Sequence, residues 1–160
     1  MAKVNSKLYT CLWFDHKAEE AANFYVSLFE DAKVTDVHHL DGTPSGDNVA
    51  LVFFRLAGQE YTAINGGPQF PFTEAVSFSV NCEDQDEVDR LWSQLTADGG
   101  GEGQCGWLKD RFGLSWQVIP DRMGELLSDP DPERSQRAMQ AMLKMQKIDV
   151  QALEDAANGS

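Results

Sequence analysis

The sequence predicts an α+β fold built from two copies of one βαβββ unit and followed by C-terminal helices. Two internal matches within the 160 residues predict it. Shifted by 67 residues, segment 14–31 overlays segment 81–98 with apolar positions in common. Shifted by 55 residues, segment 58–65 overlays segment 113–120, and a glycine opens each copy. Two separate registers argue against chance, so the chain repeats one unit.

The elements of each unit follow from two periodicities. Apolar residues recur every three to four positions in 14–31 and 81–98, which is typical of a helix that packs one face on a sheet. Alternating apolar residues on either side indicate strands. Gly58 and Gly113 mark tight turns into the last strand of each copy. The expected order is a strand at 7–14, a helix at 16–30 and strands near 34–40, 48–57 and 59–65, then a strand at 74–82, a helix at 84–97 and short strands near 102–109 and 114–119.

The first strand of each unit has two faces that differ in bulk. In the second copy the bulky apolar set is Val76, Phe78 and Val80. The small set on the opposite face is Ala75, Ser77 and Ser79. Bulk predicts that the first set packs under the helix and that the second set lines the other side of the sheet. The offset of 67 then places Tyr9, Cys11 and Trp13 under the first helix, opposite Leu8, Thr10 and Leu12.

Beyond Pro120 the pattern becomes helical. Asp131 is the expected N-cap of one helix, with Pro132 at its first position. A second helix is expected to start at Asp149, with Ile148 and Leu153 as its hydrophobic staple. An apolar stripe predicts core or a subunit interface rather than a cofactor site, and it consists of Met139, Met142, Leu143 and Met145.

These patterns divide the chain into three parts within one structural domain. We expect the first module at 7–66, the second at 74–120 and a helical tail at 121–157. The tail is expected to pack on its own sheet or on that of a partner.

Composition limits the partners. Thirteen basic against twenty-six acidic residues give a net charge of −13, which repels nucleic acid and anionic membranes. No apolar run reaches the roughly 20 residues that a membrane span needs, and the first residues lack a signal-peptide pattern. Cys11, Cys82 and Cys105 are odd in number and form no CxxC motif. We therefore expect a cytoplasmic protein without nucleic-acid or membrane partners.

Several stretches carry a resemblance to a known family. They are Ile64-Asn-Gly-Gly-Pro68, the run from Ser79 to Trp92, Cys105-Gly-Trp-Leu-Lys-Asp-Arg-Phe-Gly-Leu-Ser-Trp-Gln-Val-Ile-Pro120 and the tail from Ala141 to Asp149. From about Lys7 to about Ala157 the chain resembles the PhnB-like family of the vicinal-oxygen-chelate superfamily, often labelled 3-demethylubiquinone-9 3-methyltransferase. The resemblance implies two βαβββ modules that form a curved mixed sheet with a concave pocket, as in glyoxalase and bleomycin resistance proteins.

The resemblance also implies where a metal would lie. Metal-dependent members of the superfamily hold a divalent ion with one ligand on the first strand and one on the last strand of each unit. Carried over through the repeat, these positions are Leu8, Thr62, Ala75 and Gln117. None of them is a histidine or a carboxylate, so we predict no metal site and no cofactor. Glu60, two residues before Thr62, is the one possible exception.

The histidines and the glycine-rich run give little support for a catalytic or cofactor-binding site. His38 and His39 are adjacent and point to opposite faces of a strand, and His16 falls at a predicted helix start. The glycine run 99–103 follows a helix instead of opening one, so no S-adenosylmethionine site is visible behind the methyltransferase label. Whether the protein is an enzyme stays open.

A small-molecule pocket is the leading hypothesis. Apolar walls with a few neutral polar groups are typical of such sites. The candidate ligand-binding residues are Glu60, Thr62, Phe70, Phe72, Ser77, Trp107 and Gln117. We expect a metal-free, homodimeric protein that binds a small organic molecule. The alternatives are a metal-dependent lyase, isomerase or dioxygenase acting through Glu60, and a non-catalytic dimeric interaction protein.

Overall fold

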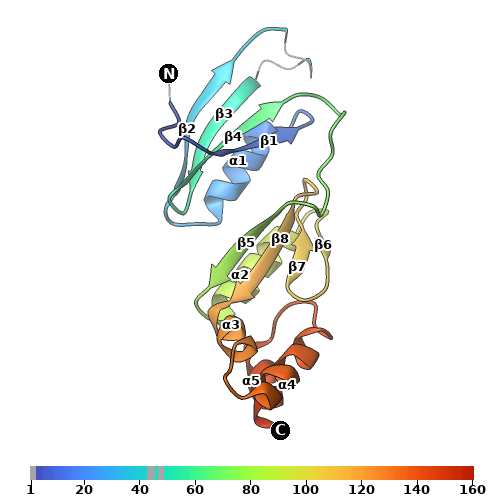
Figure 1. Ribbon diagram of the computed structural model, residues 1–160. Helices are drawn as coiled ribbons and strands as arrows, with labels where there is room; N and C mark the ends of the chain where they lie inside the picture. The colour runs from blue at the N-terminus through green and yellow to red at the C-terminus, as the bar shows by residue number, and fades with distance from the viewer. Residues whose placement is uncertain (1–2, 43–45, 47–48) are drawn as a thin grey trace. The chain divides into compact units, whose positions relative to one another are not determined.

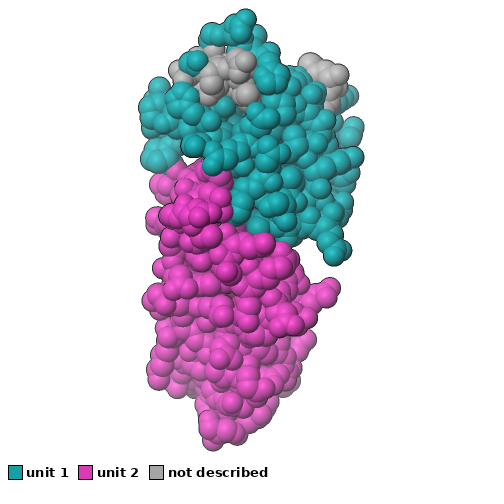
Figure 2. All heavy atoms as spheres, turned by 180° about the vertical axis from the view of Figure 1, so that it is seen from behind, with its two compact units in different colours: residues 1–71 teal, residues 72–160 magenta. Residues whose placement is uncertain are grey.

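The chain forms two compact units, residues 1–71 (unit 1) and residues 72–160 (unit 2), which are coloured separately in Figure 2. The computed structural model describes residues 3–42, 46 and 49–160. Within this described part, no helix has the length and apolar character needed to cross a membrane. Residue 48, where the third strand was expected to begin, lies outside it.

Unit 1 contains one βαβββ module. Its elements are β1 (Thr10–Phe14), α1 (Ala18–Ser27), β2 (Ala32–His39), β3 (Val49–Leu56) and β4 (Gln59–Asn65) (Figure 1). The sheet order is β1-β4-β3-β2, with β1 parallel to β4 and the other pairs antiparallel. The buried Asn65 side chain accepts a hydrogen bond from the N–H of Ala18 at 2.9 Å, so the end of β4 caps the start of α1.

Unit 2 repeats this topology. Its elements are β5 (Ser77–Cys82), α2 (Gln85–Thr96), β6 (Gly101–Glu102), β7 (Trp107–Lys109) and β8 (Ser115–Pro120), in the sheet order β5-β8-β7-β6 (Figure 1). Two four-stranded mixed sheets, each with its helix, confirm the predicted fold class.

The short strands expected near 102–109 are β6 and β7. A turn at 103–106 joins them, with the N–H of Gly103 bonded to the carbonyl of Trp107. Cys105 and Gly106 take positive φ values of 58° and 85° in this turn. A Cβ on Gly106 would also press on Ile119 and Ile148, so glycine suits this position on both counts.

The face prediction holds within β5, where Phe78 and Val80 pair with the buried Trp116 and Val118, but it is wrong for Val76, which precedes the strand and is 63% exposed. It fails in unit 1. In unit 1, Phe14 pairs with Asn65, whose side chain contacts α1, so Leu12 and Phe14 lie under the helix. Both are buried, at 3% and 4% exposure. Cys11 and Trp13 therefore point away from α1, opposite to the prediction.

The error has a local cause in the link between strand and helix. Three residues, 15–17, separate β1 from α1, whereas two, 83 and 84, separate β5 from α2. Phe14 thus corresponds to Cys82, one residue beyond the offset of 67 that the helices obey. His16 lies in the longer link with φ 62°, and α1 begins after it instead of at residue 16. A shift of one residue exchanges the two faces of a strand.

Three helices follow β8, namely α3 (Asp121–Leu127), α4 (Pro132–Met142) and α5 (Val150–Asn158). The predicted N-caps are confirmed, because Asp131 accepts from the N–H of Glu133 and Asp149 from that of Ala152. The buried staple residues Ile148 and Leu153 join a cluster with Met123 and Leu126.

The tail docks on its own unit. Gln85 of α2 bonds the carbonyl of Ile148 and the N–H of Val150, and the carbonyl of Met145 accepts from Cys105. The prediction that the methionine stripe belongs to the core is confirmed for only two of its four residues. Met142 and Met145 pack on the cluster, but Met139 and Leu143 are 47% and 58% exposed.

Truncating the centre of the tail cluster tests its contribution to stability. Ile148→Ala is expected to lower the free energy of unfolding by about 2–5 kcal/mol, because the fully buried side chain leaves a cavity. Leu143→Ala, on an exposed position of the same tail, is expected to change it by less than about 0.5 kcal/mol. Urea unfolding followed by circular dichroism measures both. Equal losses would contradict the docking of Ile148.

Thiol labelling tests the two faces of the first strands. Burial raises the pKa of Cys82 to about 12, whereas Cys11 is exposed on β1. At pH 8 the folded protein should react at Cys11 and spare Cys82, since the thiolate is the reactive species. Mass spectrometry after alkylation locates the label, and denaturant should make both cysteines react. Rapid native labelling of Cys82 would contradict its place under α2.

Candidate functional site

The faces of the two sheets that turn away from α1 and α2 carry most of the predicted site residues, whereas Phe70 and Phe72 lie between β4 and β5. On β8, Trp116 and Val118 are buried on the helix side. Since side chains alternate along a strand, Ser115 and Gln117 lie on the opposite face, which we call the open face. β5 pairs with β8 in register, so Ser77 lies beside Ser115 on that face.

Two of the predicted residues meet on the open face of unit 2. Gln117 Nε2 donates a hydrogen bond to Ser77 Oγ at 3.0 Å, and both side chains are half-buried. Trp107 of β7 is the cross-strand partner of Gln117. The three predicted residues Ser77, Trp107 and Gln117 are therefore neighbours in one sheet, although they are far apart in sequence.

A hollow of about 230 Å³ lies next to this group, and we call it the unit 2 hollow. Trp107, Lys109, Ser115 and Glu74 are among its lining residues, together with glycines of the β6 strand and turn. Lys109 Nζ forms an ion pair with the Glu74 carboxylate. The hydrogen bond from the Lys109 side chain lowers the pKa of the Glu74 carboxyl group. Glu102, also in the lining, accepts a 2.6 Å hydrogen bond from the indole N–H of Trp92.

Sequence reasoning missed Ser115. Its side chain is 1% exposed, and its hydroxyl oxygen has no hydrogen-bond partner among the described residues. A serine beside Trp116 at the start of a strand has no sequence pattern of its own. The available signal was its spacing of two residues from Gln117, because side chains two residues apart on a strand lie on the same face.

The open face of unit 1 is aromatic around Trp13. The indole N–H of Trp13 donates to the carbonyl of Gly67 at 2.9 Å, and the Phe70 ring lies edge-on at 4.9 Å between centroids. A Cβ on Gly66 would overlap the Trp13 ring, so this loop needs glycine there. Thr62 is buried on the same face, where it pairs with Cys11.

The predicted residues Glu60 and Phe72 lie outside both the unit 2 hollow and the aromatic group around Trp13. Both carboxylate oxygens of Glu60 accept hydrogen bonds from the backbone N–H groups of Asn5 and Ser6, at distances between 2.6 and 3.1 Å. Hydrogen bonds from the Ser6 side chain and these N–H groups lower the pKa of Glu60. Glu60 thus tethers the N-terminal segment to β4. Phe72 begins unit 2 and is half-buried, and it takes no part in the unit 2 hollow.

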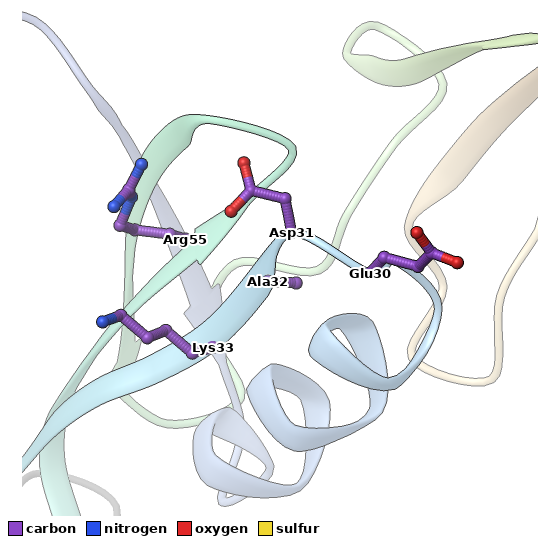
Figure 3. A pocket seen from close by; sticks show the side chains of 5 residues that line it. All are labelled: Glu30, Asp31, Ala32, Lys33 and Arg55. Carbon is purple, nitrogen blue, oxygen red and sulfur yellow. The ribbon is translucent and has the colours of Figure 1, made fainter.

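A second hollow, of about 250 Å³, lies in unit 1 and contains none of the predicted residues. Figure 3 shows Lys33 and Arg55 projecting from neighbouring strands, with Glu30 extending the opposite way. Asp31 completes the charged lining, so two acidic residues balance the two cations. Because its lining is mostly charged and includes no large apolar side chain, this hollow offers few contacts to an apolar ligand.

The side chains present do not fit a divalent metal. Thr62 and Gln117 occupy β4 and β8, whereas Leu8 and Ala75 are exposed residues that precede β1 and β5. Among the residues that the structure describes, no three His, Cys, Asp or Glu side chains converge on one point. His38 instead bonds Asp36 at 3.1 Å within β2. Divalent metals of this kind need several imidazole or carboxylate donors.

Comparison with known proteins extends this description. The model of the 3-demethylubiquinone-9 3-methyltransferase family matches residues 6–119. A solved structure from Bacillus cereus, described as a putative 3-demethylubiquinone-9 3-methyltransferase and PhnB protein, is 34% identical, covers 72% of this chain and 99% of its own, and has a TM-score of 0.67. No curated protein matches the chain significantly.

Two more distant structures show the fold alone. A Pseudomonas aeruginosa protein is 20% identical over 72% of this chain and 98% of its own, with a TM-score of 0.60. A fosfomycin resistance protein from Listeria monocytogenes is 14% identical over 71% of this chain and 91% of its own, with a TM-score of 0.51. With two βαβββ modules, a match over residues 6–119 and a relative at 34% identity, the chain belongs to the PhnB-like family labelled 3-demethylubiquinone-9 3-methyltransferase.

Proposed function

We propose that this protein binds a small organic molecule, without a metal, on the open face of its second sheet. The observation that carries the proposal is the unit 2 hollow, which lies beside the bonded pair of Gln117 and Ser77. Trp107 and Leu108 supply apolar lining and Ser115 supplies a hydroxyl. Gln117 and Ser77 lie next to the hollow as the cross-strand neighbours of Trp107 and Ser115. A concave apolar surface with few polar groups is the usual form of such a site.

A metal-dependent lyase, isomerase or dioxygenase is the alternative that the superfamily suggests. It would depend on Glu60, whose two oxygens already accept three backbone hydrogen bonds. Neither Thr62 nor Gln117 adds a carboxylate or an imidazole. Elemental analysis of the purified protein distinguishes the two functions, because one bound metal ion per chain would overturn the metal-free proposal.

The methyltransferase label is not part of our proposal. The glycine run 99–103 joins α2 to β6 and opens no helix, whereas helix N-termini are the usual positions for binding nucleotide-type cofactors. Binding without a settled chemical step is the function that the described residues support.

We also propose that two chains pair through the edge strands β1 and β5. Each is the outermost strand of its sheet, and exposed apolar side chains precede both, namely Leu8, Tyr9 and Val76. Unpaired edges with apolar neighbours favour association. Three free thiols suit a reducing compartment, which supports a cytoplasmic location. A non-catalytic interaction protein would use the exposed tail residues Met139 and Leu143 instead.

Ligand screening with a site variant tests the binding proposal. A metabolite panel should contain compounds that raise the thermal midpoint of the wild type, because a ligand that binds only the folded state stabilises it. Gln117→Ala is expected to weaken their binding about 5-fold, since one hydrogen bond contributes about 1 kcal/mol. Gln140→Ala, on the exposed side of α4, serves as the control. The proposal fails if no compound shifts the wild type.

Light scattering tests the dimer. Val76→Lys places a charge at the edge of β5 and is expected to weaken self-association about 10- to 100-fold, the loss expected from exposing one buried valine in an interface. Leu143→Lys alters an equally exposed residue of the tail and should leave the mass unchanged. A monomeric wild type, or dissociation by Leu143→Lys alone, would contradict pairing through the sheet edges.

A further inference from the structure

The side chain of Ser115 is a buried polar group without a partner, and it lines the unit 2 hollow. It is 1% exposed, and no described residue bonds its hydroxyl oxygen. A hydroxyl removed from water without a replacement hydrogen bond costs free energy, and such groups in proteins call for an explanation. A ligand atom in the hollow would supply the missing partner.

The neighbours of Ser115 restrict the ligand's shape. Ser115 pairs across the sheet with Lys109, and Trp107 lies two residues along the same strand as Lys109. Gly101 and Gly103 in the lining carry no side chains that would narrow the space. The volume of about 230 Å³ lies below the roughly 300–1,000 Å³ of drug-sized sites, so a single ring fits it. The indole of Trp107 offers such a ring a flat apolar surface.

The charges in the lining restrict the ligand further. Glu74 and Glu102 are acidic, and Lys109, already paired with Glu74, is the one cation among the residues named for this hollow. The whole chain carries a net charge of −13. Both facts disfavour an anion, because a carboxylate ligand would face two carboxylates and the field of the protein. An uncharged oxygen is therefore the better acceptor for the Ser115 hydroxyl.

We propose that the unit 2 hollow takes a small uncharged aromatic carbonyl compound, whose ring lies on Trp107 and whose oxygen accepts a hydrogen bond from Ser115. This inference rests on the proposed function and adds to it the ligand class and the residue that selects it. The proposal assigns this role to Ser115 and not to Ser77, because the Ser77 hydroxyl already accepts a hydrogen bond from Gln117.

Three one-ring probes test the proposal with the full chain. Acetophenone carries the neutral carbonyl, ethylbenzene lacks an acceptor and benzoate is charged. A ¹H–¹⁵N NMR titration follows the indole N–H of Trp107. Acetophenone is expected to bind about 2- to 10-fold more tightly than ethylbenzene, the range for one hydrogen bond, and benzoate more weakly than acetophenone.

Two variants locate the effect. Ser115→Ala should reduce acetophenone binding to the level of ethylbenzene and leave ethylbenzene unchanged. Its thermal midpoint should not fall, because the removed hydroxyl has no partner to lose. Ser79 is an exposed serine on the open face of β5 and serves as the control. Ser79→Ala should leave the affinities for all three probes unchanged.

Each outcome decides the proposal. Equal binding of acetophenone and ethylbenzene to the wild type, tighter binding of benzoate, or a loss of stability in Ser115→Ala would overturn the assignment of Ser115. If none of the probes binds while compounds of the metabolite panel do, this inference fails and the proposed function stands. If nothing binds in either experiment, both fail.

Discussion

One helix packed on one face of each four-stranded sheet is the constraint on which the rest of this structure depends. In unit 2, Val88, Leu91 and Leu95 of α2 are fully buried, as are Trp116 and Val118 on β8. Because side chains alternate along a strand, burying these residues turns their neighbours to the open face. The polar groups of the candidate site are thus placed by the packing of apolar residues on the opposite face of the sheet.

The tail contributes to the same site from outside the module. The carbonyls of Met145 and Gln146 in the tail accept hydrogen bonds from the N–H groups of Cys105 and Gly106 in the turn between β6 and β7. Met145 in turn packs against the buried cluster of the tail. That turn leads directly into Trp107, the apolar wall of the hollow. The position of Trp107 therefore depends on the docking of the tail.

The two modules share a topology and differ in chemistry on their open faces. In unit 1 the exposed Phe70 ring contacts Trp13 edge-on and Gly66 leaves room for the indole, whereas unit 2 presents hydroxyl and amide groups beside a hollow. On neither face do three His, Cys, Asp or Glu side chains of the described residues converge, as a divalent metal site requires. The two modules thus share the apolar pattern of the helix-packed face and differ on the face that the helix leaves uncovered.

The sequence by itself determined the two βαβββ units, the helix caps at Asp131 and Asp149 and the helix side of β5, because these depend on local periodicity and on neighbouring residues. It also singled out Ser77, Gln117 and Trp107 before their proximity was visible. Only the tertiary structure decided the faces of β1, where one extra residue at the left-handed His16 link exchanged the two sides. It alone revealed Ser115 as buried without a partner, since burial and hydrogen bonding depend on strands that meet from distant parts of the chain.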